Sequence, residues 1–167
     1  MGHYTLNLAK KTGKTGKVVA IEPMDDNLEY LHRNIKLNQL NNVNIVEKGV
    51  WEKKQTLTIK REKNDYQSAS LTMDKPGKMN FSVLVDSLDN ILDQNRVKKV
   101  DFMIIQLNGV ELKALHGLTK YKPFNIAIAA RYGKIQIDIV ELLKSRGYRV
   151  RSKSKHFIYA KLKNLNS

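Results

Sequence analysis

One carboxylate in the first quarter of the chain stands where nucleotide-binding sheets place an acid. Residues 17–22 read Lys-Val-Val-Ala-Ile-Glu, and they are followed by Pro23 and by residues that favour the start of a helix. In a parallel α/β sheet, an acid at the carboxyl end of such a strand can accept hydrogen bonds from the hydroxyl groups of a ribose. Glu22 is therefore the first candidate for a residue that binds a nucleotide-like ligand.

The sequence on both sides of Glu22 alternates between strand-like and helix-like patterns. Short apolar runs bounded by turn residues predict strands, and apolar residues three or four positions apart predict helices. The expected strands lie at residues 17–21, 43–46, 55–60, 81–85, 100–107, 124–130, 148–151 and 157–162. The expected helices begin after Asp25 or Asp26, after Asp86 or Ser87, after Asn108 and at about Ile135. This alternation predicts one α/β domain, residues 1–167, with a doubly wound, mainly parallel sheet and an antiparallel C-terminal strand pair.

Some details of the pattern make sharper predictions. Asp26 with Glu29, and Asn108 with Glu111, have capping-box spacing, so we expect Asp26 and Asn108 to cap their helices. The run 100–107 is almost continuously apolar, which is typical of a central strand covered on both faces. Residues 62–78 are polar and rich in turn formers, which predicts a surface loop.

The chain carries a large excess of positive charge. Its 30 Lys and Arg residues against 16 Asp and Glu residues give a formal net charge of +14. Such a field attracts nucleic acid and other anions, although a basic surface that only keeps the protein in solution has the same composition. Basic residues alternate with other residues near the end of the chain, at Arg149, Arg151, Lys153 and Lys155. On a strand they would share one face, either as a solvated surface or as a stripe that follows phosphates.

The sequence shows no interleaving of aromatic with basic residues of the kind that stacks bases, except near the basic C-terminal strands, and this counts against binding of RNA. There Tyr148 and Tyr159 accompany the alternating basic residues.

The remaining composition narrows the class of protein. The chain has no Cys, so neither a disulfide framework nor a thiolate zinc site is expected. The four His residues lack ligand spacing, and we expect no metal site. No apolar run is long enough to span a bilayer and the first residues lack a signal-peptide pattern, so we expect a cytoplasmic protein with no membrane partner.

Four passages together resemble the FkbM-type methyltransferases, a branch of the Rossmann-like enzymes that use S-adenosylmethionine (SAM). Residues 2–9 resemble the end of the family's glycine loop and its first helix, and residues 16–23 with 28–38 resemble its second strand and helix. The segment 68–71, Ser-Ala-Ser-Leu, resembles the family's serine-rich segment, and 101–118 resembles its fourth strand and the helix that follows. The passages occur in the family's order and cover nearly the whole chain.

The resemblance implies SAM as the cofactor and methyl transfer to a hydroxyl of a small molecule or sugar. The cofactor-binding residues would be Gly2, Glu22, Met24, Gly49, Gln106 and Asn108. Among them, Glu22 would accept the ribose hydroxyls and Met24 would pack against the adenine. Ser68 and Ser70 would face the substrate.

The chain departs from the family after the fourth strand. Where the family has two acids, this sequence has Gln106 and Asn108. A side-chain amide has no useful proton affinity near neutrality, so neither can act as a general base. Glu111 remains the candidate catalytic base, with helix capping as its structural alternative.

The chain also departs from the family at its start. Met1 falls one residue before Gly2, which corresponds to the last glycine of the cofactor loop, so we expect the first strand and most of the loop to be missing. That strand is central, and its loss would leave unpaired backbone groups beside the fourth strand. A late gene start, a segment supplied by another chain and a degenerate remnant that binds no SAM are the competing explanations. A homo-oligomer or a missing N-terminal partner segment could fill the gap.

We therefore expect a methyltransferase-like protein whose activity is weak or absent in this chain. One alternative is a catalytically inactive module that binds RNA or another polyanion through its basic surface. A second alternative is an RNA methyltransferase.

Overall fold

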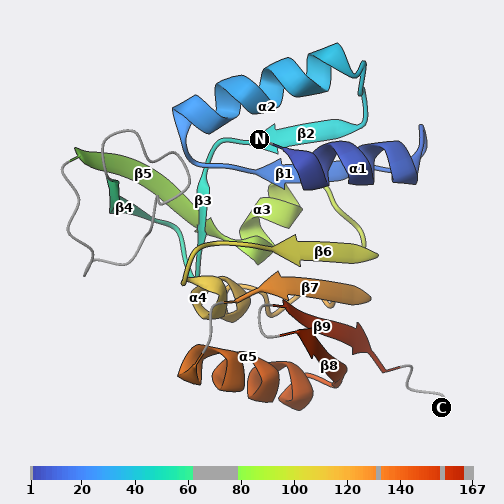
Figure 1. The fold of residues 1–167 in the computed structure, drawn as a ribbon, viewed down its shortest axis with the longest axis vertical. Coiled ribbons are helices and arrows are strands. Elements are labelled where there is room, and N and C mark those ends of the chain that lie inside the picture. Colours follow the sequence, from blue (N-terminus) through green and yellow to red (C-terminus); the bar gives the residue numbers. More distant parts are fainter. Residues whose placement is uncertain (1, 62–78, 131–132, 155–156, 164–167) are drawn as a thin grey trace.

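Three sheets and five helices make up the part of the chain that the structure describes (Figure 1). It is a computed structural model, and it describes residues 2–61, 79–130, 133–154 and 157–163. The strands are β1 Val18–Ile21, β2 Val43–Val46, β3 Gly49–Trp51, β4 Gln55–Arg61, β5 Met79–Ser87, β6 Phe102–Ile105, β7 Asn125–Ala129, β8 Tyr148–Ser154 and β9 Phe157–Leu162. The helices are α1 His3–Thr12, α2 Asp25–Leu37, α3 Leu88–Gln94, α4 Glu111–His116 and α5 Lys134–Ser145.

The sheets combine parallel and antiparallel pairs. Strands β1 and β2 form a parallel pair, β3-β5-β4 form the second sheet, and β6-β7-β9-β8 form the third. The pairs β1/β2, β3/β5 and β6/β7 are parallel, whereas β4/β5, β7/β9 and β8/β9 are antiparallel. The fold is therefore mixed α/β with the predicted antiparallel C-terminal pair, and a mainly parallel sheet is not confirmed.

The main core lies between the third sheet and the helices that pack on it. Its most buried side chains come from α3, α4, α5, β7 and β9, and include Ile91, Leu115, Ile128, Ile139 and Ile158, each no more than 1% exposed. A smaller core beside β4 and β5 contains Met24, Ile59, Val83 and Val85. Each buried aliphatic side chain contributes on the order of 1.5–3 kcal/mol relative to its exposed state.

Helix α2 begins two residues earlier than the Asp26/Glu29 capping box would require. Met24 occupies the N-cap position and no side chain caps the helix, so the predicted cap at Asp25 or Asp26 is wrong. Both Asp residues instead lie in the first turn, where their negative charge interacts favourably with the helix dipole. Leu28 and Leu31 face inward, as their spacing predicts.

Strands β1 and β6 run in the same direction but are not paired with each other (Figure 1). The N–H groups of Val18 and Glu22 bond to the β2 side, so the intervening Val19 and Ile21 direct theirs to the opposite edge. Within the described ranges, no strand pairs with that edge of β1 or with the corresponding edge of β6. Both edges are therefore unpaired within the described residues, and the expected loss of a central strand stays a prediction.

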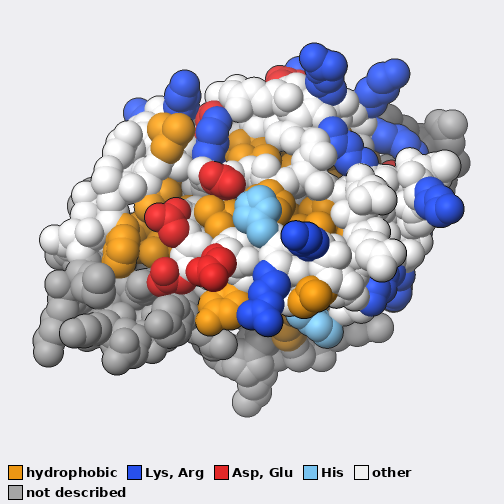
Figure 2. Space-filling model, turned by 90° about the horizontal axis from the view of Figure 1, so that it is seen from above, with side chains coloured by type: hydrophobic (Ala, Val, Ile, Leu, Met, Phe, Trp, Pro, Cys, Tyr) orange, Lys and Arg blue, Asp and Glu red, His pale blue; other side chains and the backbone are white. Residues whose placement is uncertain are grey.

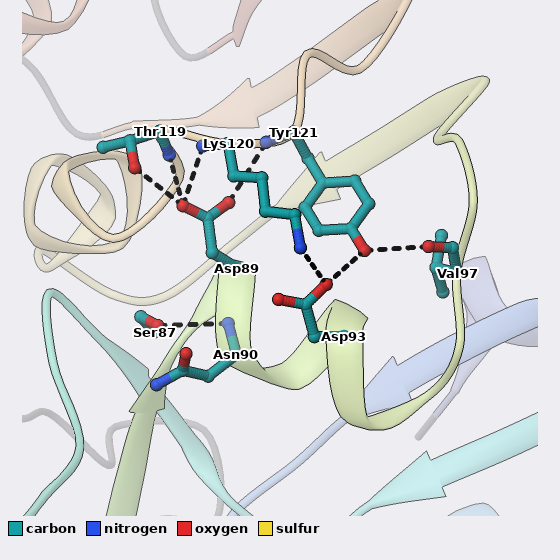
Figure 3. Close-up of polar contacts among 8 residues, drawn as sticks. All are labelled: Ser87, Asp89, Asn90, Asp93, Val97, Thr119, Lys120 and Tyr121. Carbon is teal, nitrogen blue, oxygen red and sulfur yellow. Dashed lines mark hydrogen bonds and ion pairs between the residues drawn. The ribbon is translucent and has the colours of Figure 1, made fainter.

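A cluster of hydrogen bonds joins α3 to the loop that precedes β7 (Figure 3). The Asp89 carboxylate accepts from the backbone N–H groups of Thr119, Lys120 and Tyr121 at 2.7, 2.9 and 3.2 Å, and from the Thr119 hydroxyl at 2.8 Å. Asp93 accepts from the Lys120 ammonium and the Tyr121 hydroxyl. At the start of α3, the Ser87 hydroxyl accepts from the Asn90 N–H, which confirms the predicted cap there.

Strand β6 differs most from its sequence-based prediction. It spans four residues rather than the eight of the apolar run, and Phe102 at its start is 43% exposed. Because Met103 and Ile104 are only partly buried, the prediction of a strand covered on both faces is wrong. Strand β3 was not predicted, and the loop expected at 62–78 lies outside the described residues.

Candidate cofactor site

Glu22 follows β1 directly and stands at the carboxyl end of a parallel strand, as predicted. Its Oε1 atom accepts from the Met24 backbone N–H at 3.1 Å and from Asn27 Nδ2 at 3.1 Å. Within the described residues, no hydrogen bond to Oε2 is recorded. Burial raises the pKa of the Glu22 carboxyl above its ordinary value, because the two hydrogen bonds, which lower it, do not offset the loss of hydration.

Asn27 is a site residue that the sequence analysis missed. It lies in the first turns of α2, is 7% exposed, and fixes the Glu22 side chain through its amide group. A buried Asn on the apolar side of an amphipathic helix is unusual enough to suggest a polar partner, and the carboxylate five residues earlier is that partner. An Asn on the apolar side of a predicted helix, five residues after an acid, is the sequence pattern that could have predicted this contact.

Met24 and Gly49 lie beneath the loop that carries Glu22. Met24 is 4% exposed and packs in the smaller core with Val83 and Val85. A Cβ atom on Gly49 would come within 2.8 Å of Val85 Cγ1 and 3.8 Å of the Pro23 ring. Both residues therefore hold the Glu22 loop against β5, and their predicted roles in cofactor binding stay predictions.

Gly2 begins the first described helix at the same end of the molecule as the carboxyl ends of β1, β2 and β6 (Figure 1). Its φ of 82° lies in the left-handed region, and a Cβ atom would come within 2.6 Å of Leu31 Cδ1. Both the backbone conformation and the close approach of α2 therefore favour glycine there. Since α1 has no side-chain cap, the N–H groups of its first turn bond to no capping side chain.

The loop after β6 is held from inside by Glu111. Glu111 is 1% exposed, and its Oε1 atom accepts from the backbone N–H groups of Leu107 at 3.1 Å and Gly109 at 3.2 Å. Its Oε2 atom accepts from the Gly109 N–H at 3.1 Å. This geometry gives Glu111 a structural role in the loop, and its predicted role as a base stays a prediction.

Gln106 and Asn108 lie on the same loop. Gln106 is exposed directly after β6, and Asn108 has a φ of 55°, in the left-handed region. Helix α4 begins at Glu111 with Val110 at its N-cap position, so the prediction that Asn108 caps this helix is wrong. The predicted substrate residues Ser68 and Ser70 lie outside the described residues.

The surface near Glu22 is acidic although the chain as a whole is basic. Asp25 and Asp26 begin α2, and Glu47 follows β2 with its carboxylate 3.4 Å from His32 Nε2. Figure 2 shows a group of acidic side chains on one half of the face seen from above, with Lys and Arg side chains around it and on the other half. A polyanion would therefore be repelled from this part of the surface.

Glu22 itself lines neither of two cavities formed by described residues. A shallow groove between α2 and β2 is lined by His32, Asn44 and Asn95, among others, and a cavity of about 240 Å³ lies beside Arg146 and Tyr148. No set of three His, Asp or Glu side chains within the described ranges could hold a metal ion. None of the helices described there is long and apolar enough to cross a membrane.

A mixed α/β fold with polar residues after the carboxyl ends of its parallel strands is a fold shared by many cofactor-dependent transferases. This chain belongs to the FkbM methyltransferase family, because the model of the methyltransferase FkbM domain matches residues 2–150. No curated protein matches the chain.

The crystal structure of methyltransferase FkbM from Methylobacillus flagellatus KT has a similar fold. The match has a TM-score of 0.65 at 18% sequence identity, and it covers 95% of this chain. At that identity the likeness concerns the fold alone. The chain spans 40% of the length of that protein.

Proposed function

We propose that this domain binds SAM with Glu22 as the acceptor for the ribose hydroxyls, and that it serves methyl transfer to a hydroxyl of a small molecule or sugar. Membership of the family indicates methyltransferase activity. The observation that carries the cofactor part is the carboxylate at the end of β1, which has Oε1 engaged with Asn27 and Met24 and Oε2 left for a ligand.

The surroundings of Glu22 fit the half of SAM that contains the ribose. Asn27 and the Met24 N–H fix the carboxylate before a ligand arrives, so little side-chain freedom would be lost on binding. A ribose diol would donate to a carboxylate already stripped of much of its water, where a charge-assisted hydrogen bond is strong. The sequence resemblance places the family's cofactor loop next to Gly2 and the start of α1.

The residues of this chain support methyl transfer by positioning the methyl acceptor. Bound SAM would supply the methyl group. Gln106 and Asn108 carry amides that take up no proton near neutrality, and the Glu111 carboxylate is buried against backbone N–H groups. The contribution expected from the domain is therefore orientation of the acceptor and exclusion of water rather than general base catalysis.

Full affinity also requires an element that joins β1 to β6. The backbone edges that face each other there would complete one doubly wound sheet if a parallel strand paired with both. We propose that such a strand, with its glycine loop, holds the methionine half of SAM. On that account the chain alone binds SAM weakly, and it binds more tightly when the strand is supplied from an upstream in-frame segment or from another chain.

Isothermal titration calorimetry with SAM tests the proposal. The Glu22→Ala variant should bind SAM about tenfold to a hundredfold more weakly than the wild type, because a hydrogen bond to a charged group contributes about 1.5–3 kcal/mol. The matched control is Glu29→Gln, which alters an exposed acid on the adjacent helix α2 and should leave the affinity unchanged. No heat of binding and no thermal shift with the wild type, or equal affinity of wild type and Glu22→Ala, would contradict the proposal.

A further inference from the structure

The sheet β6-β7-β9-β8 has one face packed in the core and one face that carries exposed aromatic and basic side chains. On the packed face, Ile126, Ile128 and Ile158 are no more than 2% exposed, and α5 packs on β8 and β9. On the other face, Phe102 is 43% exposed and Tyr159 is 42% exposed. Exposed aromatic side chains that lie together in one patch indicate an interaction site.

The register of the strands aligns these residues in rows. Phe102, Asn125, Lys161 and Arg149 form one row across the sheet, and Ile104, Ala127, Tyr159 and Arg151 form the next. Residues that are directly opposite on paired strands project to the same face. The second row therefore places the Tyr159 ring beside Arg151, whereas in the first row Asn125 lies between Phe102 and Lys161. We call this surface, defined by Phe102, Phe157, Tyr159, Lys161, Arg149 and Arg151, the open face.

Two contacts show how the aromatic and basic groups are arranged on β9. The Phe157 and Tyr159 rings stack with their centroids 6.4 Å apart and an interplanar angle of 28°. The Lys161 ammonium lies 5.2 Å from the centroid of the Phe124 ring, at the start of β7. Aromatic surface thus continues along one strand and ends beside a positive charge.

The charge of the open face has one sign. Strands β6, β7, β8 and β9 contain no Asp or Glu, and Arg149, Arg151 and Lys161 are all exposed. Arg149 and Arg151 lie in a field that also contains exposed rings, which a merely solvated surface does not require.

We propose that the open face binds single-stranded nucleic acid. Unpaired bases would stack on Tyr159 and Phe102, and the phosphates between them would lie against Arg149, Arg151 and Lys161. Aromatic platforms beside cations, without acids, are the features that bind a single strand. A duplex hides the base faces that the rings would contact, and an anionic membrane needs the charge but not the rings. The proposal does not depend on methyl transfer.

Fluorescence anisotropy with a labelled oligouridylate tests the proposal on the full chain. Tyr159→Ala should weaken binding about tenfold, since stacking of one base contributes about 1–3 kcal/mol, whereas Tyr159→Phe keeps the ring and should retain the affinity. The double variant Arg149→Ala/Arg151→Ala should reduce the slope of log affinity against log salt by about 1.4 for two lost phosphate contacts.

Matched controls separate this site from general attraction by a basic protein. Tyr30→Ala removes an aromatic ring that is 53% exposed on α2, and Lys53→Ala/Lys54→Ala removes two exposed cations from the turn between β3 and β4. Neither control should change the affinity by more than about twofold. Because Tyr159 is exposed, thermal unfolding of its variants should match the wild type.

Three results would overturn the proposal. One is equal loss of affinity in the Lys53/Lys54 control, which would mean that net charge alone binds the oligonucleotide. Another is unchanged binding by Tyr159→Ala. The third is evidence for another partner on the open face. Such evidence would be either a dimer in analytical ultracentrifugation that Tyr159→Ala dissociates or full competition with the oligonucleotide by vesicles of anionic lipid.

Discussion

At the scale of single residues, Glu22 is kept charged in a place that does not favour charge. Burial raises the pKa of its carboxyl, and Asn27 and the Met24 N–H only partly compensate. Such a group decreases folding stability at neutral pH. A buried carboxylate that lowers the stability of the fold is a good candidate for a binding role.

This cost can be measured with Glu22→Gln. A folded pKa above the unfolded value means that the native state binds more protons between the two values, so stability falls as pH rises through that range. Glutamine keeps an oxygen to accept from Asn27 and carries no charge, so the variant should have a higher midpoint of thermal unfolding at pH 7. The difference should disappear below the ordinary pKa of glutamate. A variant that is less stable than the wild type at pH 7 would contradict this account.

Glu111 is expected to affect stability more than chemistry. Glu111→Ala would leave the buried N–H groups of Leu107 and Gly109 without their acceptor, which should lower the free energy of unfolding by about 1–3 kcal/mol in urea. Glu141→Ala, on the exposed side of α5, is the matched control and should change it little. If Glu111 were the catalytic base, Glu111→Gln would instead abolish methyl transfer and leave stability unchanged.

At the scale of elements, the loops at the ends of the strands are fixed by carboxylates that accept from backbone N–H groups. Glu111 does so after β6, and Asp89 does so before β7 (Figure 3). Although burial would raise the pKa of the Asp89 carboxyl, hydrogen bonds from Lys120, Thr119 and Tyr121 outweigh it and lower the pKa. Asp89 therefore stabilises the fold, in contrast to Glu22.

Asp89→Ala should separate α3 from the loop at 119–121. The free energy of unfolding should fall by about 1.5–3 kcal/mol, and the amides of Thr119 and Tyr121 should exchange faster. Since the pKa of Asp89 is lowered in the fold, its contribution is present above the ordinary pKa of aspartate and is lost as the pH falls through the folded value. Asp101→Ala, in an exposed pair with Lys99, should cost less than about 1 kcal/mol. Equal effects of the two substitutions would refute the role of Asp89.

At the scale of the whole molecule, the divided sheet makes a prediction about backbone exchange. Val19 and Ile21 direct their N–H groups away from β2, towards the side where no described strand pairs with β1. Their amides should exchange with deuterium on the order of tenfold or more faster than those of Ile126 and Ile128, which lie on a strand paired on both sides. Equal protection, measured by NMR, would mean that the edge of β1 is already paired in solution.

The sequence predicted the alternation of elements better than their ends and surroundings. Apolar runs located β1, β2, β7 and β9 because burial determines those patterns. The capping-box spacings failed at Asp26 and Asn108, since the loops before α2 and α4 place Met24 and Val110 at the N-cap positions instead. The pattern of residues along the sequence does not show which face of a sheet is covered by other elements.

The candidate site was predictable only in part. Glu22 follows from its position after a strand, but Asn27 becomes a site residue only through the path of α2, which brings its amide to the carboxylate. The sequence places Tyr159 near the alternating basic residues, but the open face depends on the register of four strands, so Phe102 could not be assigned to it beforehand.

The distribution of charge gives the molecule two different surfaces. Asp25, Asp26 and Glu47 lie near Glu22, whereas the strands of the open face carry cations and rings and contain no Asp or Glu. A cofactor site and a nucleic-acid site could therefore coexist without competing for the same residues. Whether the first exists is the central question for the function of this domain.

The most direct measurement is a binding cycle that combines Glu22→Ala with SAM analogues lacking the ribose hydroxyls. If Glu22 accepts those hydroxyls, removing them should weaken binding to the wild type about tenfold or more and should have no further effect on the variant, because the two changes remove the same interaction. If the hydroxyls contribute equally to binding by the wild type and by Glu22→Ala, the two losses are independent. The account of Glu22 as the ribose acceptor would then be contradicted.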